Sequence, residues 1–166
     1  MGNPGRGDTT RPFDTTDEAL WDSVVDRDRQ QELCVVIAFH PETSRIGELC
    51  RISCADDPLI VGRDFPEFFA PGAAQSKGIG DRFVSREAFS LVREGVQWRL
   101  NRHPGRSRLR INAQELPAQE LFCEEQLQQG LIVSLAQRVV LHLRLQAPQP
   151  SQQDTVAVLA SLKGVS

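Results

Sequence analysis

The chain has 166 residues, of which 40% are hydrophobic and 25% are charged, a composition typical of a globular protein and not of a disordered one. This length predicts one domain whose core needs neither a metal nor a disulfide. With 19 basic and 22 acidic residues the formal net charge is −3, which argues against a uniformly cationic nucleic-acid binder. No apolar run approaches the ~20 residues of a membrane span, and the N-terminus lacks the apolar core of a secretory signal. We therefore expect a cytoplasmic protein with no membrane partner.

Residues 1–14 are rich in Gly, Pro and Thr and are predicted to form a flexible leader. Thr15 and Glu18 then have the spacing of a capping box. Four apolar residues at helical spacing follow, namely Leu20, Trp21, Val24 and Val25. The pattern predicts a helix over residues 15–30, which we expect to pack against the domain or against a partner.

Between residues 31 and 146 the pattern changes to short β-like runs separated by turn residues. Several runs alternate, so that Leu141 and Leu143 face one way and His142 faces the other. Many short strands with little helix between them indicate an all-β fold, either an antiparallel sandwich or a barrel. The predicted strands are 33–39, 47–54, 59–62, 87–93, 96–100, 108–111, 130–135 and 138–145.

Two connections between these strands carry information. Asn112-Ala113 is predicted to turn a hairpin, because asparagine tolerates a positive φ. Residues 64–81 contain proline, glycine and small residues. They predict a long loop, with room for a helical turn, that is anchored by Phe65, Phe68 and Phe69.

Catalytic and metal-binding patterns are missing from the sequence. None of His40, His103 and His142 stands beside a paired Cys, Asp or Glu at metal-ligand spacing, and Cys50 and Cys54 lack a second pair. Neither a nucleophile-elbow motif nor a phosphate-binding P-loop is present. We therefore expect no catalytic residues, no metal and no cofactor, and we expect the four cysteines to be buried, reduced thiols.

Three features occur in order on the β framework. A predicted strand ends in Gly62-Arg63, and Ser85-Arg86 comes just before another strand. Residues 99–110 then hold five arginines and no acidic residue, and they lead into the turn at Asn112. An arginine fork and a serine hydroxyl supply the charge-assisted donors that a phosphate dianion needs. Taken singly, each of these residues is more often an ordinary strand-end, turn or solvated surface residue than a ligand.

This order resembles the forkhead-associated (FHA) domain family, which has a G-R pair at a strand end, then S-R-x-H, then S-x-N-G-T-x-V-N-G. The family pattern ends with a late strand after D-G-x-x-x-L. Within residues 33–145 the matches are Gly62-Arg63, Ser85-Arg86 and Ile111-Asn112, and Gly130 with Leu135 corresponds to the glycine and leucine of that last motif. The resemblance implies an antiparallel β-sandwich that binds phosphothreonine peptides with loops at one end. It assigns phosphate contacts to Arg63 and Ser85, and Ser107 takes the place of the asparagine that orders a loop against the peptide. The candidate peptide-binding residues are Arg63, Ser85, Arg86, Arg106, Ser107 and Asn112.

The sequence departs from the family pattern at three places. Ala88 replaces the histidine of S-R-x-H, Ser107-Arg108-Leu109 replaces N-G-T, and Ile111-Asn112-Ala113 replaces V-N-G. A serine hydroxyl cannot make both hydrogen bonds of the family's amide. An alternative is therefore a phosphate-independent module for protein–protein contact or self-association. A third hypothesis, nucleic-acid binding through residues 99–110, is disfavoured by the acidic net charge and by the lack of interleaved aromatic residues.

Residues 147–166 begin as a Pro/Gln-rich linker and then predict a short helix that ends near Gly164. This pattern predicts the start of a following segment. The final residues, LASLKGVS, are similar to the lead-in of the ATPase domain of sigma-54-dependent transcriptional activators. That resemblance implies that the chain is the sensory N-terminal part of a bacterial regulator.

Overall fold

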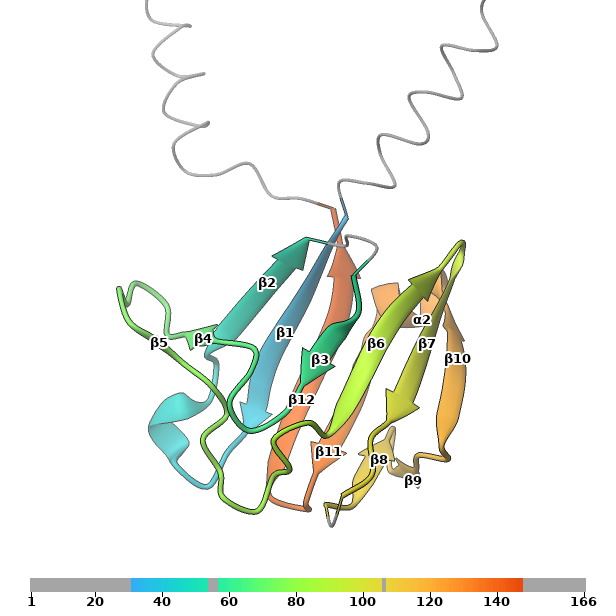
Figure 1. Ribbon diagram of the computed structural model, residues 1–166. Helices are drawn as coiled ribbons and strands as arrows, with labels where there is room; N and C mark the ends of the chain where they lie inside the picture. The colour runs from blue at the N-terminus through green and yellow to red at the C-terminus, as the bar shows by residue number, and fades with distance from the viewer. Residues whose placement is uncertain (1–30, 54–56, 106, 148–166) are drawn as a thin grey trace, which may run out of the picture.

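The computed structural model describes residues 31–53, 57–105 and 107–147, which form two packed antiparallel sheets (Figure 1). The large sheet contains, in spatial order, β5 (Ser76–Lys77), β4 (Phe68–Phe69), β2 (Leu49–Ser53), β1 (Glu32–Phe39), β12 (Val139–Gln146), β11 (Leu131–Leu135), β8 (Leu109–Ile111) and β9 (Gln114–Glu115). The small sheet contains β10 (Gln119–Cys123), β7 (Gln97–Arg102), β6 (Phe89–Glu94) and β3 (Leu59–Val61). A 3-10 turn, η1 (Thr43–Arg45), and one short helix, α2 (Glu124–Gln129), complete the described elements. The predicted all-β antiparallel sandwich is confirmed.

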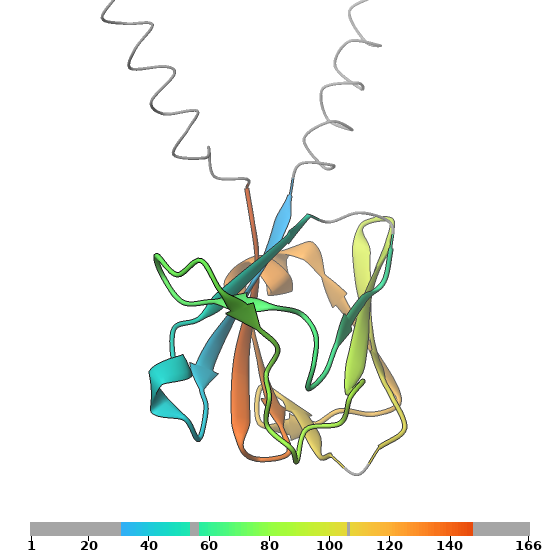
Figure 2. The ribbon, with the colours of Figure 1, turned by 60° about the vertical axis from the view of Figure 1, so that its left-hand side comes forward.

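The core lies between the two sheets, which Figure 2 shows as separate layers. Strand β12 buries every second residue, from Val139 to Leu145, and β1 buries Leu33, Val35 and Ile37 in the same way. The facing layer contributes its own buried side chains from β6 and β7, namely Phe89, Leu91, Trp98 and Leu100. Each such side chain contributes roughly 1.5–3 kcal/mol when it leaves water, so the alternation seen in the sequence specifies which face of each strand turns inward.

Strand β10 and helix α2 are among the elements that were not predicted from the sequence. Strand β10 lies at an edge of the small sheet, and within its run of five residues only Phe122 is buried, so it shows no apolar alternation. Helix α2 has six residues and buries Leu127 alone, which is too short for a periodic signal. This helix lies between the two sheets at the upper end of the sandwich (Figure 2).

The hairpin predicted at Asn112-Ala113 is confirmed. The two residues have φ values of 47° and 71°, and the flanking Ile111 and Gln114 pair as neighbours in β8 and β9. A second turn with positive φ, at Ala136 and Gln137 between β11 and β12, was not predicted because it contains neither glycine nor asparagine.

The segment 64–81 differs from its prediction. It contains the short strands β4 and β5, which pair with each other and extend the large sheet, and it contains no helical turn. Of the three phenylalanines expected to anchor it, only Phe68 is buried, whereas Phe65 and Phe69 are 55% and 43% exposed. The second anchor is Ile79, which is fully buried.

The described cysteines, Cys34, Cys50 and Cys123, are all free thiols. Only Cys50 is buried, and its burial raises the pKa of the thiol to about 11. The expectation of burial is wrong for Cys34 and Cys123, which are partly exposed. Cys54 and both predicted flanking helices lie outside the described residues. Over the described part of the chain, no helix has the length and apolarity that crossing a membrane requires.

Candidate functional site

The segment that follows β3 and the segment that precedes β6 lie toward the lower end of the sandwich, opposite the end where β1 begins and β12 ends (Figure 1), and they contain residues 63 and 85. The antiparallel pairing of β3 with β6 brings the two segments together, and the Arg63 N–H donates to the Ser85 carbonyl at 2.9 Å. Gly62 makes this approach possible, because a Cβ atom there would lie 1.7 Å from the Arg86 carbonyl oxygen. The strand-end glycine is thus required by packing against the neighbouring backbone.

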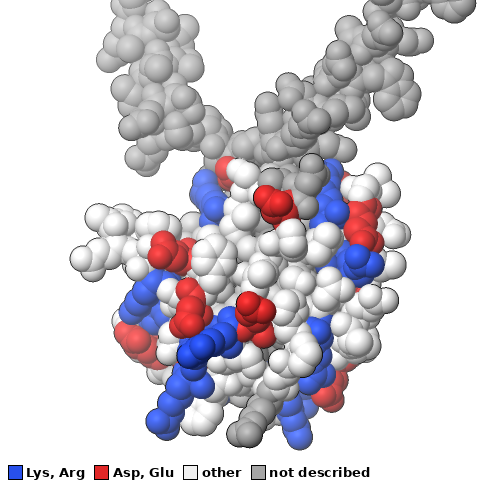
Figure 3. All heavy atoms as spheres, in the orientation of Figure 1, with Lys and Arg blue, Asp and Glu red and all other residues white. Residues whose placement is uncertain are grey.

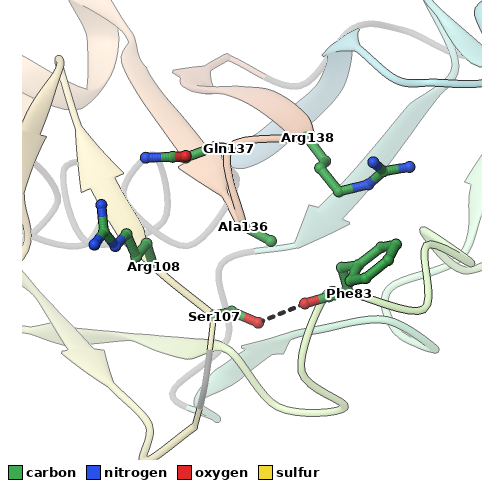
Figure 4. Close-up of a pocket in the computed structure, with 6 residues that line it drawn as sticks. All are labelled: Phe83, Ser107, Arg108, Ala136, Gln137 and Arg138. Carbon is green, nitrogen blue, oxygen red and sulfur yellow. Dashed lines mark hydrogen bonds between the residues drawn. The ribbon is translucent and has the colours of Figure 1, made fainter.

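Ser107 ties the connection between β7 and β8 to the same place. Its Oγ accepts from the Ser85 N–H at 3.0 Å, lies 2.9 Å from the Ser85 hydroxyl, and donates to the Phe83 carbonyl at 2.8 Å (Figure 4). Gly105 approaches so closely that a Cβ atom there would lie 2.6 Å from the Ser85 Oγ. Two loops that are 22 residues apart in sequence are therefore held together by one hydroxyl group.

The directions of these hydrogen bonds decide what Ser85 can offer a ligand. A hydroxyl group has one proton. Because the proton of Ser107 goes to the Phe83 carbonyl, the Ser85 hydroxyl must donate to Ser107. For Ser85 to donate to an anion, its proton has to turn away from Ser107. That exchange replaces a neutral hydrogen bond worth ~0.5–1.5 kcal/mol with a charge-assisted one worth ~1.5–3 kcal/mol.

The side chain of Arg63 lies beside a cavity that neither Ser85 nor Ser107 lines. Its Nε is 3.6 Å from the Asp64 carboxylate, and it borders a cavity of about 250 Å³, which we call the loop cavity. The loop cavity is lined by His40, Glu42, Arg45, Arg63, Asp64, Lys77, Gly78, Ile79 and Gly80. The structure thus joins the backbones of residues 63 and 85, while the guanidinium of Arg63 lies among the side chains of the segment 64–81.

A buried ion pair organises the loop cavity. Arg45 is 1% exposed and donates to Glu48 from both Nε, at 3.0 Å, and Nη2, at 2.6 Å. The same guanidinium donates to the backbone carbonyls of Lys77 and Ile79. It therefore fastens the segment that follows β5, and Gly80 from that segment donates its N–H to the Arg63 carbonyl at 2.8 Å.

His40 supports the same carbonyl from the other side. Its Nε2 lies 3.0 Å from the Ile79 oxygen and donates to it, while Nδ1 accepts the Glu42 N–H at 3.0 Å. These two bonds use both ring nitrogens of a neutral imidazole. Sequence reasoning treated His40 as uninformative and did not single out Arg45 or Glu48, because no spacing motif marks a contact 34 residues away.

A second hollow lies on the other side of Ser107. It has a volume of about 240 Å³ and is lined by Phe83, Ser107, Arg108, Ala136, Gln137 and Arg138 (Figure 4). We call it the turn cavity, because the β11–β12 turn forms one wall. Figure 4 shows the Arg108 and Arg138 side chains pointing away from each other, with the Ala136 methyl group between them. Two cations and one hydroxyl group at its border make this cavity compatible with an anionic ligand.

Arg138 is held by two neighbours in the turn cavity. Its Nε donates to the Asp81 carboxylate at 3.0 Å, and its guanidinium carbon lies 4.6 Å from the centre of the Phe83 ring. Burial acts to raise the pKa of Asp81, but the Phe83 N–H and the Arg138 guanidinium outweigh it and hold this pKa below its ordinary value. Arg82 also lies over Phe83, at 4.9 Å, so this half-exposed ring is a platform for two arginines.

The other predicted site residues lie elsewhere. Asn112 is at the far end of β8 from Ser107, about 16 Å away at strand rise, and its Oδ1 accepts the Ile132 N–H at 3.1 Å. Arg86 borders a separate hollow formed with Ile60 and Phe65, among others. The structure therefore brings Arg63, Ser85 and Ser107 together and leaves Asn112 as a turn residue bonded to β11. Arg106 lies outside the described residues.

The arginine-rich stretch 99–110 does not form one continuous basic face. Arg99 forms an ion pair with Glu94, and Arg102 donates to the Leu116 carbonyl at 3.2 Å. In Figure 3, basic and acidic side chains alternate over the face shown, including the lower end that carries the loops. In the described part of the chain, moreover, no group of three His, Cys, Asp or Glu side chains is placed to hold a metal ion.

The architecture is shared with solved FHA domains. The chain is similar to the FHA domain of an Arabidopsis thaliana hypothetical protein, with 13% identity, coverage of 74% of this chain and 92% of that one, and a TM-score of 0.52. The domain has an FHA-like fold. It is also similar to the FHA domain of the CT664 protein from Chlamydia trachomatis, with 12% identity, coverage of 68% and 96%, and a TM-score of 0.48. No protein-family model matches the sequence, and no curated protein does.

Within this FHA-like fold, Ala88 stands in place of the motif histidine and is held by backbone hydrogen bonds. Ala88 is buried, donates its N–H to the Val61 carbonyl at 2.8 Å, and accepts the His103 N–H at 3.0 Å. The His103 ring in turn lies 3.1 Å from the Ser90 hydroxyl. A histidine on the neighbouring connection therefore bonds to β6 beside Ala88.

Proposed function

We propose that this FHA-like domain is a protein–protein interaction module, without catalysis of its own, that binds a threonine-phosphorylated segment of a partner. The observation that carries the proposal is the junction of the Arg63, Ser85 and Ser107 loops at one end of the sandwich. Arg63 lines one cavity and Ser107 lines another, and both cavities have arginine in their lining. A phosphate dianion needs several converging N–H and O–H donors, and the Arg63 guanidinium and the Ser85 hydroxyl are the candidates for this role.

Two small rearrangements would complete the site. The Ser85 hydroxyl turns its proton from Ser107 to the phosphate, and the Arg63 guanidinium leaves Asp64. The second step costs little, because that pair is 3.6 Å long and Asp64 is largely exposed. Exposed ion pairs contribute only ~0–1 kcal/mol. A dianion is a stronger partner for arginine than one solvated carboxylate, so binding favours the rearranged state.

Paired peptides test the proposal. The full chain is titrated with a phosphothreonine peptide library and with the same peptides unphosphorylated, and we expect affinity only for the phosphorylated set. Arg63→Ala removes one charge-assisted contact and is expected to weaken binding by ~1.5–3 kcal/mol, or roughly 10- to 150-fold. Arg144→Ala is the matched control, because Arg144 is an exposed arginine on β12 whose Nε donates to the Gln128 carbonyl. An unchanged affinity after Arg63→Ala would contradict the assignment of the phosphate contact.

A second candidate function, phosphate-independent contact with a protein, is favoured by one specific observation. In the structure Ser85 gives its proton to Ser107, and the nearest carboxylate to Arg63 is that of Asp64. Both donors are thus already engaged. Equal affinities for phosphorylated and unphosphorylated partner segments would support this second candidate.

The wider role that we propose is cytoplasmic signalling, as the sensory part of a bacterial sigma-54-dependent regulator. Support comes from the resemblance of the LASLKGVS segment, which lies outside the described residues. The coding sequence beyond Ser166 tests this role directly. We expect it to encode an ATPase domain followed by a helix-turn-helix, and any other arrangement would contradict the regulator assignment without affecting the peptide site.

A further inference from the structure

The outer face of the large sheet carries an apolar row at right angles to the strands. Strand pairing aligns Phe69 with Leu49, Leu49 with Val36, Val36 with His142, and His142 with Ile132. Directly paired residues in antiparallel strands point to the same face. The row therefore crosses β4, β2, β1, β12 and β11, and its one polar member is His142 on β12. Its ends are open to solvent, because Phe69 is 43% exposed and Ile132 is 42% exposed.

A basic row lies beside it, toward the end of the sheet where β1 begins. Cys34 pairs with Arg51 on one side and with Arg144 on the other, and both arginines are exposed. The two rows are two residues apart along β1, or about 7 Å at strand rise. An α-helix is about 10 Å wide, so one helix laid across the strands covers both rows.

The segment that precedes β1 in the sequence has chemistry that matches this face. Residues 15–30, predicted as a helix, have an apolar stripe made by Leu20, Trp21, Val24 and Val25. Their five acidic residues, Asp17, Glu18, Asp22, Asp26 and Asp28, exceed their two arginines, which gives a formal charge of 2 − 5 = −3. An apolar stripe with an acidic surplus is complementary to an apolar row with arginines beside it.

The attachment to β1 lets the apolar stripe reach this face. Its last residue, Val25, is separated from the first residue of β1, Glu32, by six residues, which span up to about 20 Å when extended. The row at Val36 lies four residues along β1, or about 13 Å from Glu32 at strand rise. A helix that ends near Val25 therefore reaches the row, and the short connection raises its effective concentration at this face.

We propose that the segment 15–30 docks on the outer face of the large sheet of its own chain through the helix around Trp21. The apolar stripe packs on the row between Phe69 and Ile132, and acidic residues of the segment face Arg51 and Arg144. This interaction covers the sheet face and leaves the Ser85–Ser107 end of the sandwich open to a ligand. It does not depend on whether that ligand is phosphorylated.

Hydrogen exchange and tryptophan fluorescence of the full chain test the proposal. Trp98 is buried, so the difference between the full chain and its Trp21→Phe variant isolates Trp21. We expect residues 17–28 to exchange at least about tenfold more slowly than the same residues in a free peptide of residues 1–31. We also expect the Trp21 emission to be blue-shifted and its acrylamide quenching to be reduced.

Two substitutions separate docking from helix formation alone. Ile132→Glu and Phe69→Glu place an acid at the exposed ends of the row, and each is expected to restore fast exchange in residues 17–28 and acrylamide quenching of Trp21. Val96→Glu is the matched control, because Val96 is 76% exposed in the β6–β7 hairpin of the small sheet. Circular dichroism of each variant checks that the sandwich is intact.

The other outcomes overturn the proposal. Exchange of residues 17–28 at the free-peptide rate would show that the helix does not dock. Protection that survives both row substitutions would place it elsewhere on the molecule. Protection that grows with protein concentration would identify a second copy as the occupant of the face, since binding within one chain does not depend on concentration.

Discussion

In the loop cavity, Arg45 is 1% exposed, forms an ion pair with buried Glu48 and donates to two backbone carbonyls. In the turn cavity, the side chain of Arg138 is 42% exposed and shares its guanidinium between Asp81 and the face of Phe83. Both arginines form ion pairs, but Arg45 is almost fully buried whereas the side chain of Arg138 is largely exposed. The loop cavity is therefore organised by an arginine that is almost fully buried and whose donors already have partners. The turn cavity presents its organising arginine to solvent, so the same group can hold the loop and meet a ligand.

Removing Arg45 is expected to have the largest effect on this comparison. Arg45→Met leaves the Glu48 carboxylate buried and without its cation, and such losses cost ~3–5 kcal/mol of the free energy of unfolding. Urea unfolding followed by circular dichroism measures the change. The control is Arg93→Met, which removes an arginine whose Nε makes an exposed hydrogen bond to the Gly95 carbonyl, and it is expected to cost less than ~1 kcal/mol. Equal losses in the two variants would show that burial does not distinguish Arg45 from a surface arginine.

Ser107, which stands between the two cavities, is expected to have an intermediate effect. Ser107→Ala leaves the Ser85 N–H without its acceptor and the Phe83 carbonyl without its donor, which should cost ~1–3 kcal/mol of unfolding free energy. The same change frees the Ser85 proton. Isothermal titration should therefore show phosphopeptide binding that is weakened less than in Ser85→Ala. A greater loss for Ser107→Ala would mean that Ser107 itself contacts the ligand.

The Asp81–Arg138 pair predicts a dependence of stability on pH in the turn cavity. The pKa of Asp81 in the folded state lies below its ordinary value. Its contribution to stability is therefore full above the unfolded-state pKa of about 3.9 and is lost as the pH falls through the lower, folded-state pKa. Asp81→Asn keeps an oxygen for the Phe83 N–H but removes the charge. We expect a loss of ~1 kcal/mol at pH 7, which shrinks below about pH 4, when denaturant unfolding is repeated across this range. A loss that is constant with pH would contradict the ion pair as its source.

The two cavities also differ from the strands in how well the sequence predicts them. Alternation in β12 and in β6 predicts the sandwich, because burial of one strand face is a local property of the residues. The G-R and S-R pairs predict the end of the fold at which residues 63 and 85 lie. The direction of the Arg63 side chain is not predictable in this way, since it depends on a loop that Arg45 holds through the Ile79 carbonyl, 34 residues away.

The turn cavity is missed for a related reason. Its wall at Ala136-Gln137 has positive φ values without the glycine or asparagine that normally marks them. The proton of the Ser85 hydroxyl is a further example. Its orientation follows from the Phe83 carbonyl, a backbone group that no sequence motif can identify. Arg45 and Ser107 both donate hydrogen bonds to backbone carbonyls. These bonds shape the site, and a sequence motif does not identify them.

The substitution with the smallest expected effect on stability, Phe83→Leu, tests which cavity a ligand enters. Phe83→Leu removes the ring on which Arg82 and Arg138 lie, and two half-exposed cation–π contacts are worth ~1–2 kcal/mol together. Leucine keeps an apolar side chain at this half-exposed position, so we expect a loss of stability near ~0.5 kcal/mol. Its effect on phosphopeptide affinity is the sharper measurement. If the ligand extends from Ser85 into the turn cavity, Phe83→Leu weakens binding of long peptides but not of a peptide cut short on that side. If the ligand extends only into the loop cavity, both peptides keep their affinity after Phe83→Leu and both lose it after Arg63→Ala.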